Sequence, residues 1–359
     1  MKISIFIPPK FSKKALDIKY LNKLTDKNWI YTSNGRASIY HILKSIDADK
    51  ILVPVYICET VLLPIKKLGI SVSFYDIDIE DLNPSLESIK KLSKQYSIKV
   101  ILVASMYGNP ANLIEIEKYC KENNIYMIDD GAQSFGAKLD DRFIGTFGDA
   151  GFFSFSPGKP TAGHMGSFFW SKDNIDIIRT RHFLTHYFKW LDFYINRYSI
   201  YKKYNVILRK CINLVSRVLF KFININNDAI CNFEKNILGG ILFSILNNEF
   251  GFRDKYSRDF IEKFKFSKKF RIIKNIRGLA SNHKLVMVFF ESNKVDIFIK
   301  FMLKSNIYSS NGYKLLCDDL QDLPNAKIIN KCVVELPIED DEEKMKFIFD
   351  KVAEFENSH

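Results

Sequence analysis

The first half of this chain alternates short apolar segments with longer amphipathic ones, and this alternation constrains the fold more than any other feature. Residues 99–106 form a continuous apolar run, of the kind that is buried on both faces in a parallel sheet. Residues 36–46 carry apolar side chains at helical spacing after the start signal Ser33-Asn34-Gly35. Strands that alternate with helices of about 10–15 residues predict an α/β domain with a mostly parallel sheet flanked by helices.

The pattern changes near the middle of the chain. In the first half we expect strands at 50–55, 71–77, 99–106, 125–130, 150–155 and 166–170, and helices at 36–46, 59–68, 84–95 and 112–123. Residues 176–250 look almost entirely helical, and strands at 284–290 and 331–336 then mix with helices at 294–304 and 340–357. We therefore expect a large domain over 1–230, which includes the basic helical segment 176–225, and a smaller C-terminal α+β domain over 231–359.

Composition is that of a soluble protein. Apolar residues make up 47% and charged residues 26% of the chain, and no run of about 18 apolar residues could span a membrane. The six cysteines show no C-x-x-C spacing, which predicts neither a zinc site nor a disulfide framework. We expect a cytoplasmic protein without a bound metal.

The net charge of +12 is concentrated in one segment. Between Arg181 and Lys221 there are nine Lys and Arg residues and one acid, Asp192. This distribution argues against a nucleic-acid-binding protein and favours a local basic surface. Residues 205–223 within it form a basic amphipathic pattern, for which packing on protein, including a dimer face, is favoured over contact with an anionic membrane surface.

Three segments of the first half carry polar residues that a sheet core does not need. The first, at 33–38, is a glycine turn that opens a helix, where backbone N–H groups and the helix dipole attract phosphate. The second, Asp129-Asp130-Gly131, follows an apolar strand, where side chains point into the ligand crevice of an open α/β sheet. The third, at 153–160, is a tight Gly/Pro turn in which desolvation would make the amine of Lys159 nucleophilic.

Each of these segments alone is more often structural, but together they match the needs of pyridoxal 5′-phosphate (PLP). An acid keeps the pyridine nitrogen of this cofactor protonated, and a lysine forms a Schiff base with it. A serine hydroxyl and backbone N–H groups bind its phosphate. The order of an N-terminal cradle, an acid after a strand and a lysine turn supplies all three.

Longer motifs extend this match. They include Met106-Tyr-Gly-Asn-Pro-Ala-Asn, Ile128-Asp-Asp-Gly-Ala-Gln-Ser-Phe-Gly-Ala and Phe153-Ser-Phe-Ser-Pro-Gly-Lys, and they cover roughly residues 30–170 in order. By these motifs the chain resembles the DegT/DnrJ family of sugar aminotransferases, which are fold type I, PLP-dependent enzymes acting on nucleotide-linked keto sugars. Residues 325–330 and 335–338 resemble the end of the family more loosely.

The resemblance implies a role for each motif residue. Lys159 would form the Schiff base, Asp130 would partner the pyridine nitrogen, and Gln133 would contact the ring hydroxyl. The phosphate would be bound by one serine and by the start of the first predicted helix, namely Ser154, Gly35, Arg36 and Ala37.

The resemblance also implies an activity and an assembly. The activity is transfer of an amino group, from glutamate as donor, to the ketone of a nucleotide-diphosphate sugar, as in amino-sugar and surface-polysaccharide biosynthesis. The assembly is a homodimer in which a second subunit completes each site. One alternative is pyridoxamine-dependent dehydration at C3 of the sugar, against which Lys159 argues because that branch implies a histidine at its position. The other is a catalytically silent binding or regulatory protein on the same fold.

The sequence departs from the family pattern in four places. Cys58 stands where an aromatic ring often stacks on the cofactor, so stacking is weakened or comes from elsewhere, with Tyr56 as a candidate. Arg36 replaces a common threonine and either contacts the phosphate or faces away. Met165-Gly-Ser replaces Glu-Gly-Gly, and no Asn-x-Arg motif is evident near 226–234.

Three histidines follow the lysine turn before residue 190. His164 is expected to be structural or solvent-facing rather than a substrate contact. His182 and His186 have i,i+4 spacing but lack the carboxylate pattern of a metal site, so we do not expect them to bind a metal.

Overall fold

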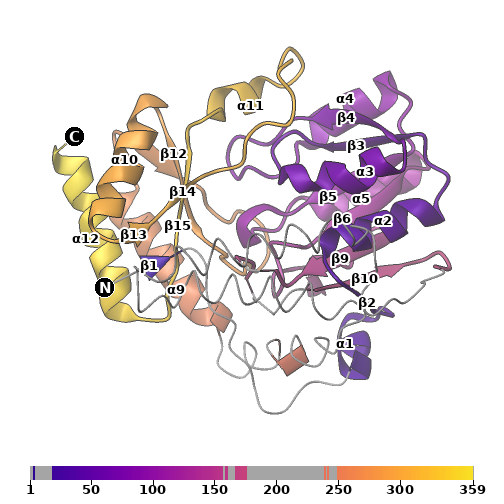
Figure 1. The fold of residues 1–359 in the computed structure, drawn as a ribbon, viewed down its shortest axis with the longest axis horizontal. Helices are drawn as coiled ribbons and strands as arrows, with labels where there is room; N and C mark the ends of the chain where they lie inside the picture. The colour runs from indigo at the N-terminus through magenta and orange to yellow at the C-terminus, as the bar shows by residue number, and fades with distance from the viewer. Residues whose placement is uncertain are drawn as a thin grey trace, which may run out of the picture.

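The computed structural model describes residues 3–4, 18–156, 158–160, 166–175, 238–239, 241 and 249–358. Two domains lie side by side in it, one built around a central sheet and one around a smaller sheet near the C-terminus (Figure 1). The strands of the large domain are β2 (Ile30–Thr32), β3 (Lys50–Pro54), β4 (Ser71–Tyr75), β5 (Val100–Ala104), β6 (Tyr126–Asp130), β7 (Lys138–Leu139), β8 (Arg142–Phe143), β9 (Ala150–Ser154) and β10 (Ser167–Ser171). Its helices are α1 (Ile18–Thr25), α2 (Gly35–Ser45), α3 (Leu62–Lys67), α4 (Leu86–Gln95) and α5 (Leu113–Glu122).

The central sheet has seven strands in the order β2-β10-β9-β6-β5-β3-β4. The five strands from β9 to β4 run parallel, and β10 is antiparallel to both of its neighbours. The predicted fold class is therefore confirmed, and each predicted strand lies within two residues of its expected bounds. The chain passes from β3 out to β4 and returns to β5 on the other side of β3, which makes the carboxyl ends of β3 and β5 a topological switch point.

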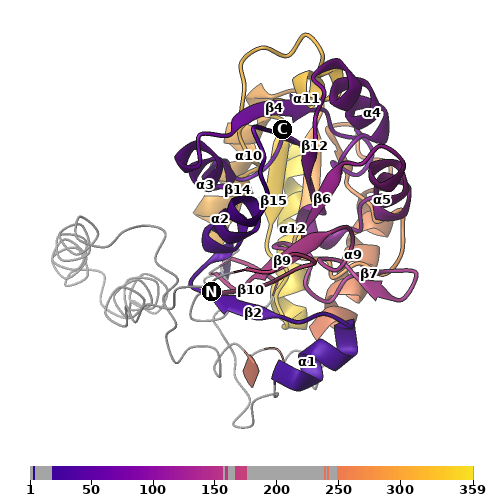
Figure 2. The same cartoon turned by 90° about the vertical axis from the view of Figure 1, so that its right-hand side faces the viewer.

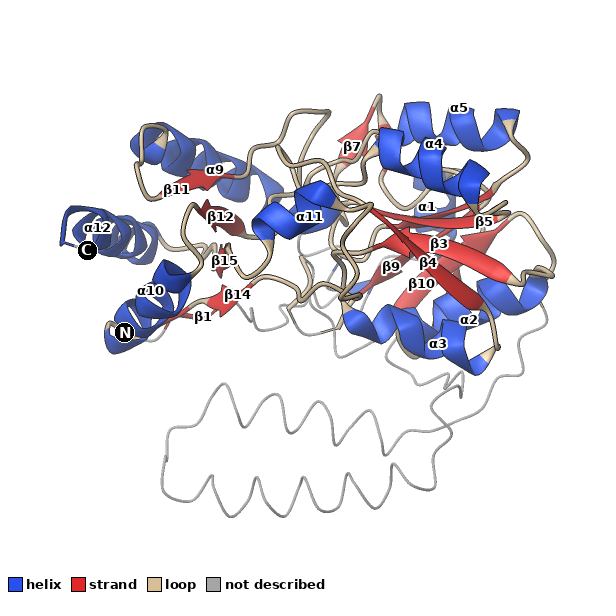
Figure 3. Ribbon diagram, turned by 90° about the horizontal axis from the view of Figure 1, so that it is seen from above, coloured by secondary structure: helices blue, strands red, loops and turns tan. Residues whose placement is uncertain are grey.

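Helices cover both faces of this sheet. α2 and α3 lie on one face, and α4 and α5 lie on the other (Figures 2 and 3). The helices turn their apolar sides to the strands, as α5 does with Leu113, Ile116 and Tyr119. Strand β5 is buried at every position between the two helix layers, which explains why its sequence is uniformly apolar. The helices predicted at 36–46, 84–95 and 112–123 are confirmed, and the one predicted at 59–68 begins with a 3-10 turn at Glu59–Val61.

The small domain is an antiparallel sheet in the order β11-β12-β15-β14. Its elements are α9 (Glu249–Phe264), β11 (Phe270–Ile272), β12 (Leu285–Phe289), α10 (Asn293–Lys304), β13 (Ile307–Tyr308), β14 (Ser310–Asn311), α11 (Pro324–Ile329), β15 (Val333–Leu336) and α12 (Glu342–Ser358). Its core is rich in phenylalanine, with Phe260, Phe289, Phe298 and Phe355 fully enclosed. The strands and helices predicted for this region are confirmed.

The start of the chain also contributes to the small domain. β1 (Ile3–Ser4) pairs in parallel with β13, and Ile3 is completely buried in the small-domain core. The sequence predicts a domain boundary at residue 230. The boundary itself, the segment 205–223 and most of the predicted helical stretch 176–250 lie outside the described residues.

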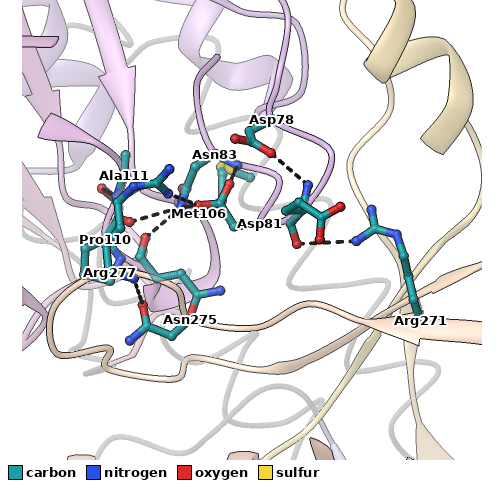
Figure 4. A network of polar contacts seen from close by, with 12 residues as sticks. Asp78, Asp81, Asn83, Met106, Pro110, Ala111, Arg271, Asn275 and Arg277 are labelled. Atoms are coloured by element: carbon teal, nitrogen blue, oxygen red, sulfur yellow. Dashed lines mark hydrogen bonds and ion pairs between the residues drawn. The ribbon is translucent and has the colours of Figure 1, made fainter. Parts of the chain in front are cut away.

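A polar network joins the two domains. Arg277, from the loop after β11, places Nη1 2.6 Å from Oδ2 of the buried Asp81 in the large domain. Asn83 Nδ2 donates to the same oxygen at 3.1 Å, and Arg271 donates to backbone carbonyls of the 79–80 turn. Figure 4 shows Arg271 and Arg277 on opposite sides of Asp81. The contacts fix the small domain against the loop that follows β4.

The described residues also bear on membrane spans, metal sites and disulfides. Among the described residues, no helix is both long and apolar enough to cross a membrane. In the same part of the chain, no three His, Cys, Asp or Glu side chains are grouped so that they could hold a metal ion. Cys58, Cys120, Cys317 and Cys332 are free thiols.

Candidate active site

A cavity of about 300 Å³ opens at the carboxyl ends of the parallel strands. The segments after β3, β5 and β6, the end of β9 and the first turn of α2 all contribute to its wall. This is the place where open α/β sheets bind ligands, because the loops diverge there at the switch point. Of the predicted site residues, the cavity is lined by Gly35, Arg36, Asp130, Gln133, Ser154 and Lys159.

The two consecutive aspartates at the end of β6 have different environments. Asp129 is fully buried, and its Oδ2 accepts backbone N–H groups of Gly145 at 2.6 Å and of Phe147 at 3.0 Å. Asp130 lines the cavity, and its Oδ1 accepts the N–H of Ala132 at 2.9 Å. Since side chains alternate along a strand, only one of the two can face the cavity. The structure gives this place to Asp130, as predicted.

Lys159 lines the same cavity as this carboxylate. The lysine is half-buried, and its backbone N–H donates to Ser156 O at 3.2 Å in a turn where Gly158 has φ of 82°. Burial lowers the pKa of the Lys159 amine, and the charge of Asp130 opposes this shift. Burial raises the pKa of Asp130 to about 6, against the effects of the Ala132 N–H and of Lys159. The two groups are therefore close enough to stabilise each other's charged forms.

The first turn of α2 forms another part of the wall. Asn34 caps the helix, because its Oδ1 accepts the N–H of Ala37 at 3.2 Å. A Cβ on Gly35 would lie 3.3 Å from the ring of Phe152, so a glycine here lets the helix start close to β9. Arg36 faces the cavity, which decides between its two predicted orientations. Ala37 is buried behind it, with its N–H already bonded to the cap.

Two polar side chains of the cavity are fixed by neighbours. Ser154 Oγ donates to Ser156 Oγ at 3.4 Å, so two hydroxyls stand together near the start of α2. Gln133 Oε1 accepts the N–H of Tyr107 at 3.3 Å, and its Nε2 lies 3.6 Å from Met106 Sδ. The bond to the backbone of Tyr107 therefore holds the side-chain amide of Gln133 in place.

Tyr56, the candidate for supplying the missing stacking ring, is not among the residues that line the cavity. The Tyr56 hydroxyl lies 2.6 Å from the Tyr107 hydroxyl and accepts the N–H of Tyr313 at 3.2 Å, and the ring is fully buried away from the cavity. Cys58 does line the cavity, with Sγ 3.1 Å from Thr60 Oγ1. The segment after β3 thus places the thiol of Cys58 and the hydroxyl of Thr60 at the position where an aromatic ring often stacks in the family.

Some cavity residues were not predicted. Asn34, Thr60, Ser105 and Ser156 line the wall, and only Asn34 and Ser156 lie inside motifs that could have indicated them. The small domain adds a buried ion pair between Lys284 and Glu335, whose charges act on Lys159. His164, His182 and His186 lie outside the described residues.

A half-buried lysine facing a buried aspartate, next to a capped helix start at the switch point of a mostly parallel sheet, defines the large domain of a fold type I enzyme. The model of the DegT/DnrJ/EryC1/StrS aminotransferase family matches residues 13–191, which is half of the chain. The protein belongs to this family.

Individual relatives cover less of the chain. It is 39% identical over 106 residues to GDP-4-keto-6-deoxy-D-mannose 3-dehydratase of Escherichia coli O55:H7, covering 30% of this chain and 27% of the relative. It is 28% identical over 172 residues to GDP-perosamine synthase of Escherichia coli O157:H7, covering 46% and 47%. The match thus spans between about a quarter and a half of these relatives.

The fold is shared over nearly the whole chain. The solved structure of E. coli GDP-4-keto-6-deoxy-D-mannose-3-dehydratase with bound hydrated PLP aligns with a TM-score of 0.70. The alignment covers 93% of this chain and 90% of that one at 19% identity. It therefore shows that both domains, and not only the segment that matches the family model, have the fold type I arrangement.

Proposed function

We propose that this protein is a PLP-dependent aminotransferase that transfers an amino group to the keto group of a nucleotide-linked sugar. The observation that carries the proposal is that Lys159 and Asp130 line the same cavity as the start of α2, with the charge of each acting on the other. The family match and the two nucleotide-sugar relatives support the substrate class. Glutamate is the proposed amino donor, and amino-sugar or surface-polysaccharide biosynthesis is the proposed context.

The residues of the cavity fit PLP. Asp130 would hold the proton on the ring nitrogen, and Gln133 would contact the ring hydroxyl. The phosphate would be bound at the start of α2 by Arg36 and by Ser154, where a cation, hydroxyl groups and the positive end of a helix converge. When bound, the cofactor supplies an electron sink that allows an amino group to be exchanged between donor and acceptor.

The chain itself supplies the acid–base chemistry. Because burial lowers the pKa of Lys159, a larger fraction of its Nζ is neutral at physiological pH than for a solvated lysine. A neutral Nζ can take a proton from a reacting carbon and return it to another, as general base and then general acid. Asp130 stays largely ionised at neutral pH, since its pKa is raised only to about 6.

Activity of the PLP-loaded protein tests the proposal. Incubation with glutamate and a panel of GDP-, dTDP- and UDP-linked keto sugars should yield an amino sugar, detected by mass spectrometry, together with 2-oxoglutarate. Lys159→Ala should lower the rate by about 10⁴-fold or more, because no other group replaces Nζ. Lys172→Ala is the matched control, since Lys172 is exposed and paired with Asp149. Equal rates in wild type and Lys159→Ala would contradict the mechanism.

Dehydration at C3 of the sugar is the second candidate, favoured by the 39% identity to a 3-dehydratase. Lys159 argues against dehydration, because the resemblance implies a histidine at this position in the dehydratase branch of the family. The same incubation separates the two reactions: a sugar that loses its 3-hydroxyl without gaining nitrogen would establish dehydration.

We further propose a cytoplasmic homodimer in which 205–223 packs on protein rather than on a membrane. The resemblance supports the dimer, and the free thiols of the described residues agree with a reducing compartment. Light scattering should give twice the 41.8 kDa of one chain, and a monodisperse monomer would refute the dimer. Binding to anionic vesicles that persists at high salt and is lost in Leu214→Glu would instead establish membrane contact.

A further inference from the structure

Three buried hydroxyl groups lie between the first turn of α2 and the strands beneath it. Thr32 on β2 and Ser167 on β10 are cross-strand partners, and Ser167 is in turn the partner of Ser154 on β9. Because partners in an antiparallel pair point to the same face of a sheet, these three side chains form a row. α2 packs on β9 and β10, and its Ser38 contacts the row (Figure 3). The hydroxyl-bearing residues Thr32, Ser38 and Ser167 are completely buried.

These three hydroxyl groups form a continuous chain of hydrogen bonds. Ser38 Oγ lies 2.8 Å from both Thr32 Oγ1 and Ser167 Oγ, and Ser167 Oγ donates to the carbonyl of Phe153. A carbonyl only accepts, so the single hydroxyl proton of Ser167 is used there. Ser38 therefore donates to Ser167, and Thr32 donates to Ser38 while sharing its proton with Asn34 O at 3.3 Å. Each serine hydroxyl accepts one bond and donates one, so neighbouring bonds strengthen each other.

The chain of hydrogen bonds connects the two parts of the cavity wall where we propose that the phosphate binds. Ser38 lies two residues after Arg36 in the first turn of α2, and Phe153 directly precedes Ser154 at the end of β9. Arg36 and Ser154 both line the cavity. The two elements are close, since a Cβ on Gly35 would lie 3.6 Å from the Cβ of Ser154. The buried hydroxyl groups can therefore act on a ligand through these two side chains.

We propose that Thr32, Ser38 and Ser167 are positioning residues for the phosphate group of PLP. Their hydrogen bonds fix the start of α2 to the end of β9, so that Arg36 and Ser154 can contact one phosphate group together. A donor displaced by about 1 Å loses much of a charge-assisted bond. Ser167 replaces a glycine of the family pattern, which has no hydroxyl group to continue the chain. The inference rests on the cofactor site of the proposed function and not on the transfer of an amino group.

The experiment compares two ligands that differ in the phosphate. Pyridoxal has the ring and the aldehyde of PLP but carries a hydroxyl group in place of the phosphate. Titrations followed by cofactor absorbance give the Kd of each ligand, and the ratio of the two measures the contribution of the phosphate. In Ser38→Ala we expect the Kd of PLP to rise about tenfold and the Kd of pyridoxal to stay within about twofold of the wild-type value, because Ser38 is the member of the chain that α2 contributes.

Thr32 offers a matched pair of variants. Thr32→Val removes the hydroxyl group and keeps the shape of the side chain, whereas Thr32→Ser keeps the hydroxyl group. The Kd of PLP should rise about threefold in Thr32→Val and stay at the wild-type value in Thr32→Ser. Ser45→Ala is the control, since Ser45 Oγ bonds to Ile42 O at the other end of the same helix. It should change neither Kd.

An equal loss of affinity for both ligands would overturn the proposal. If Ser38→Ala raises the Kd of PLP and that of pyridoxal by the same factor, or changes neither, the hydroxyl groups do not position a phosphate site. Should Ser38→Ala not fold, the two Thr32 variants decide by the same ratio. A wild type that binds PLP no more tightly than pyridoxal would also refute the proposal. If the ratios behave as expected and no amino sugar is formed, the proposed aminotransferase activity fails and the positioning role stands.

Discussion

Two adjacent aspartates at the end of β6 have the same side chain but different surroundings. Asp130 faces the cavity, whereas Asp129 binds the backbone of the loop before β9. We expect Asp130→Asn to keep the thermal stability of the wild type and to lower turnover by about 10²–10³-fold, because a neutral amide cannot hold a proton on the ring nitrogen of the cofactor. Assays of the PLP-loaded variant measure this.

Asp129→Asn is the matched comparison for that substitution. An amide oxygen can still accept the N–H groups of Gly145 and Phe147, so turnover should fall much less than in Asp130→Asn. The reverse ranking would show that Asp129 is the partner of the ring nitrogen and that the assignment is off by one residue.

The raised pKa of Asp129 leads us to expect that the stability of the protein depends on pH. Burial raises the pKa of Asp129 to about 7, against 3.8 for an ordinary aspartate. Between these values the folded state binds more protons than the unfolded state, so this residue's contribution to stability is full below about pH 4 and is lost as the pH rises through about 7. The loss is at most about 4 kcal/mol. Asp130, with its pKa raised to about 6, acts in the same direction.

Urea unfolding of the cofactor-free protein tests this linkage. The decline in unfolding free energy between about pH 4 and about pH 7 should be shallower in Asp129→Asn than in the wild type, because an amide does not titrate. Parallel declines in the two proteins would mean that Asp129 ionises normally in the fold.

At the scale of elements, the first turn of helix α2 forms the part of the cavity wall where we propose that the phosphate binds. Arg36 is the cationic residue that α2 contributes to that wall, and burial lowers the pKa of its guanidinium. Arg36→Met should weaken PLP binding by about tenfold or more, since it removes a charge-assisted hydrogen bond. A titration followed by cofactor absorbance measures the affinity.

The control for Arg36→Met is Lys44→Met, an exposed cation at the other end of the same helix. It should leave PLP affinity unchanged. If both substitutions weaken binding equally, the effect comes from overall charge and not from a contact at the helix start.

How far the sequence predicts an element depends on the length of its pattern. The helices and the five-residue strands between 36 and 171 have enough residues for a period of 3.6 or 2 to be visible, and they form where expected. β1, β13 and β14 have two residues each, which is too short for any period. They exist because distant segments supply partners, and that information is absent from local sequence.

Local sequence likewise identifies some residues of the candidate active site and misses others. Asp130, Ser154 and Lys159 lie in motifs, and their placement in one cavity follows from strand ends meeting at one edge of a sheet. Tyr56 was misplaced because a motif does not say to which side a side chain turns after a strand. Arg253 belongs to no motif and reaches the carbonyl of Pro160 through tertiary packing alone.

For the whole molecule, the contact of Arg277 with Asp81 is a test of how the domains are held together. Asp81 is completely buried, and burial raises its pKa while Asn83 and Arg277 lower it. Arg277→Met leaves this carboxylate without its cation and should cost about 2 kcal/mol of unfolding free energy, less than a fully buried pair because Arg277 is 27% exposed.

A double-mutant cycle isolates the pair. Asp81→Asn combined with Arg277→Met should cost less than the sum of the two single substitutions, since the second change removes a partner that is already lost. Strict additivity in urea unfolding would show that the two side chains act independently and that other contacts orient the domains.

The pairing of β1 with β13 has a consequence for the order in which the chain can acquire its structure during synthesis. All seven strands of the large sheet have been translated once Ser171 is made, so every strand of this sheet has its pairing partner early. Ile3 is the reverse case, because its neighbour Ile307 emerges from the ribosome near the end of translation. The first strand to be synthesised therefore remains unpaired until almost the whole protein has been translated. Its pairing with β13 is then a late event in the folding of the small domain.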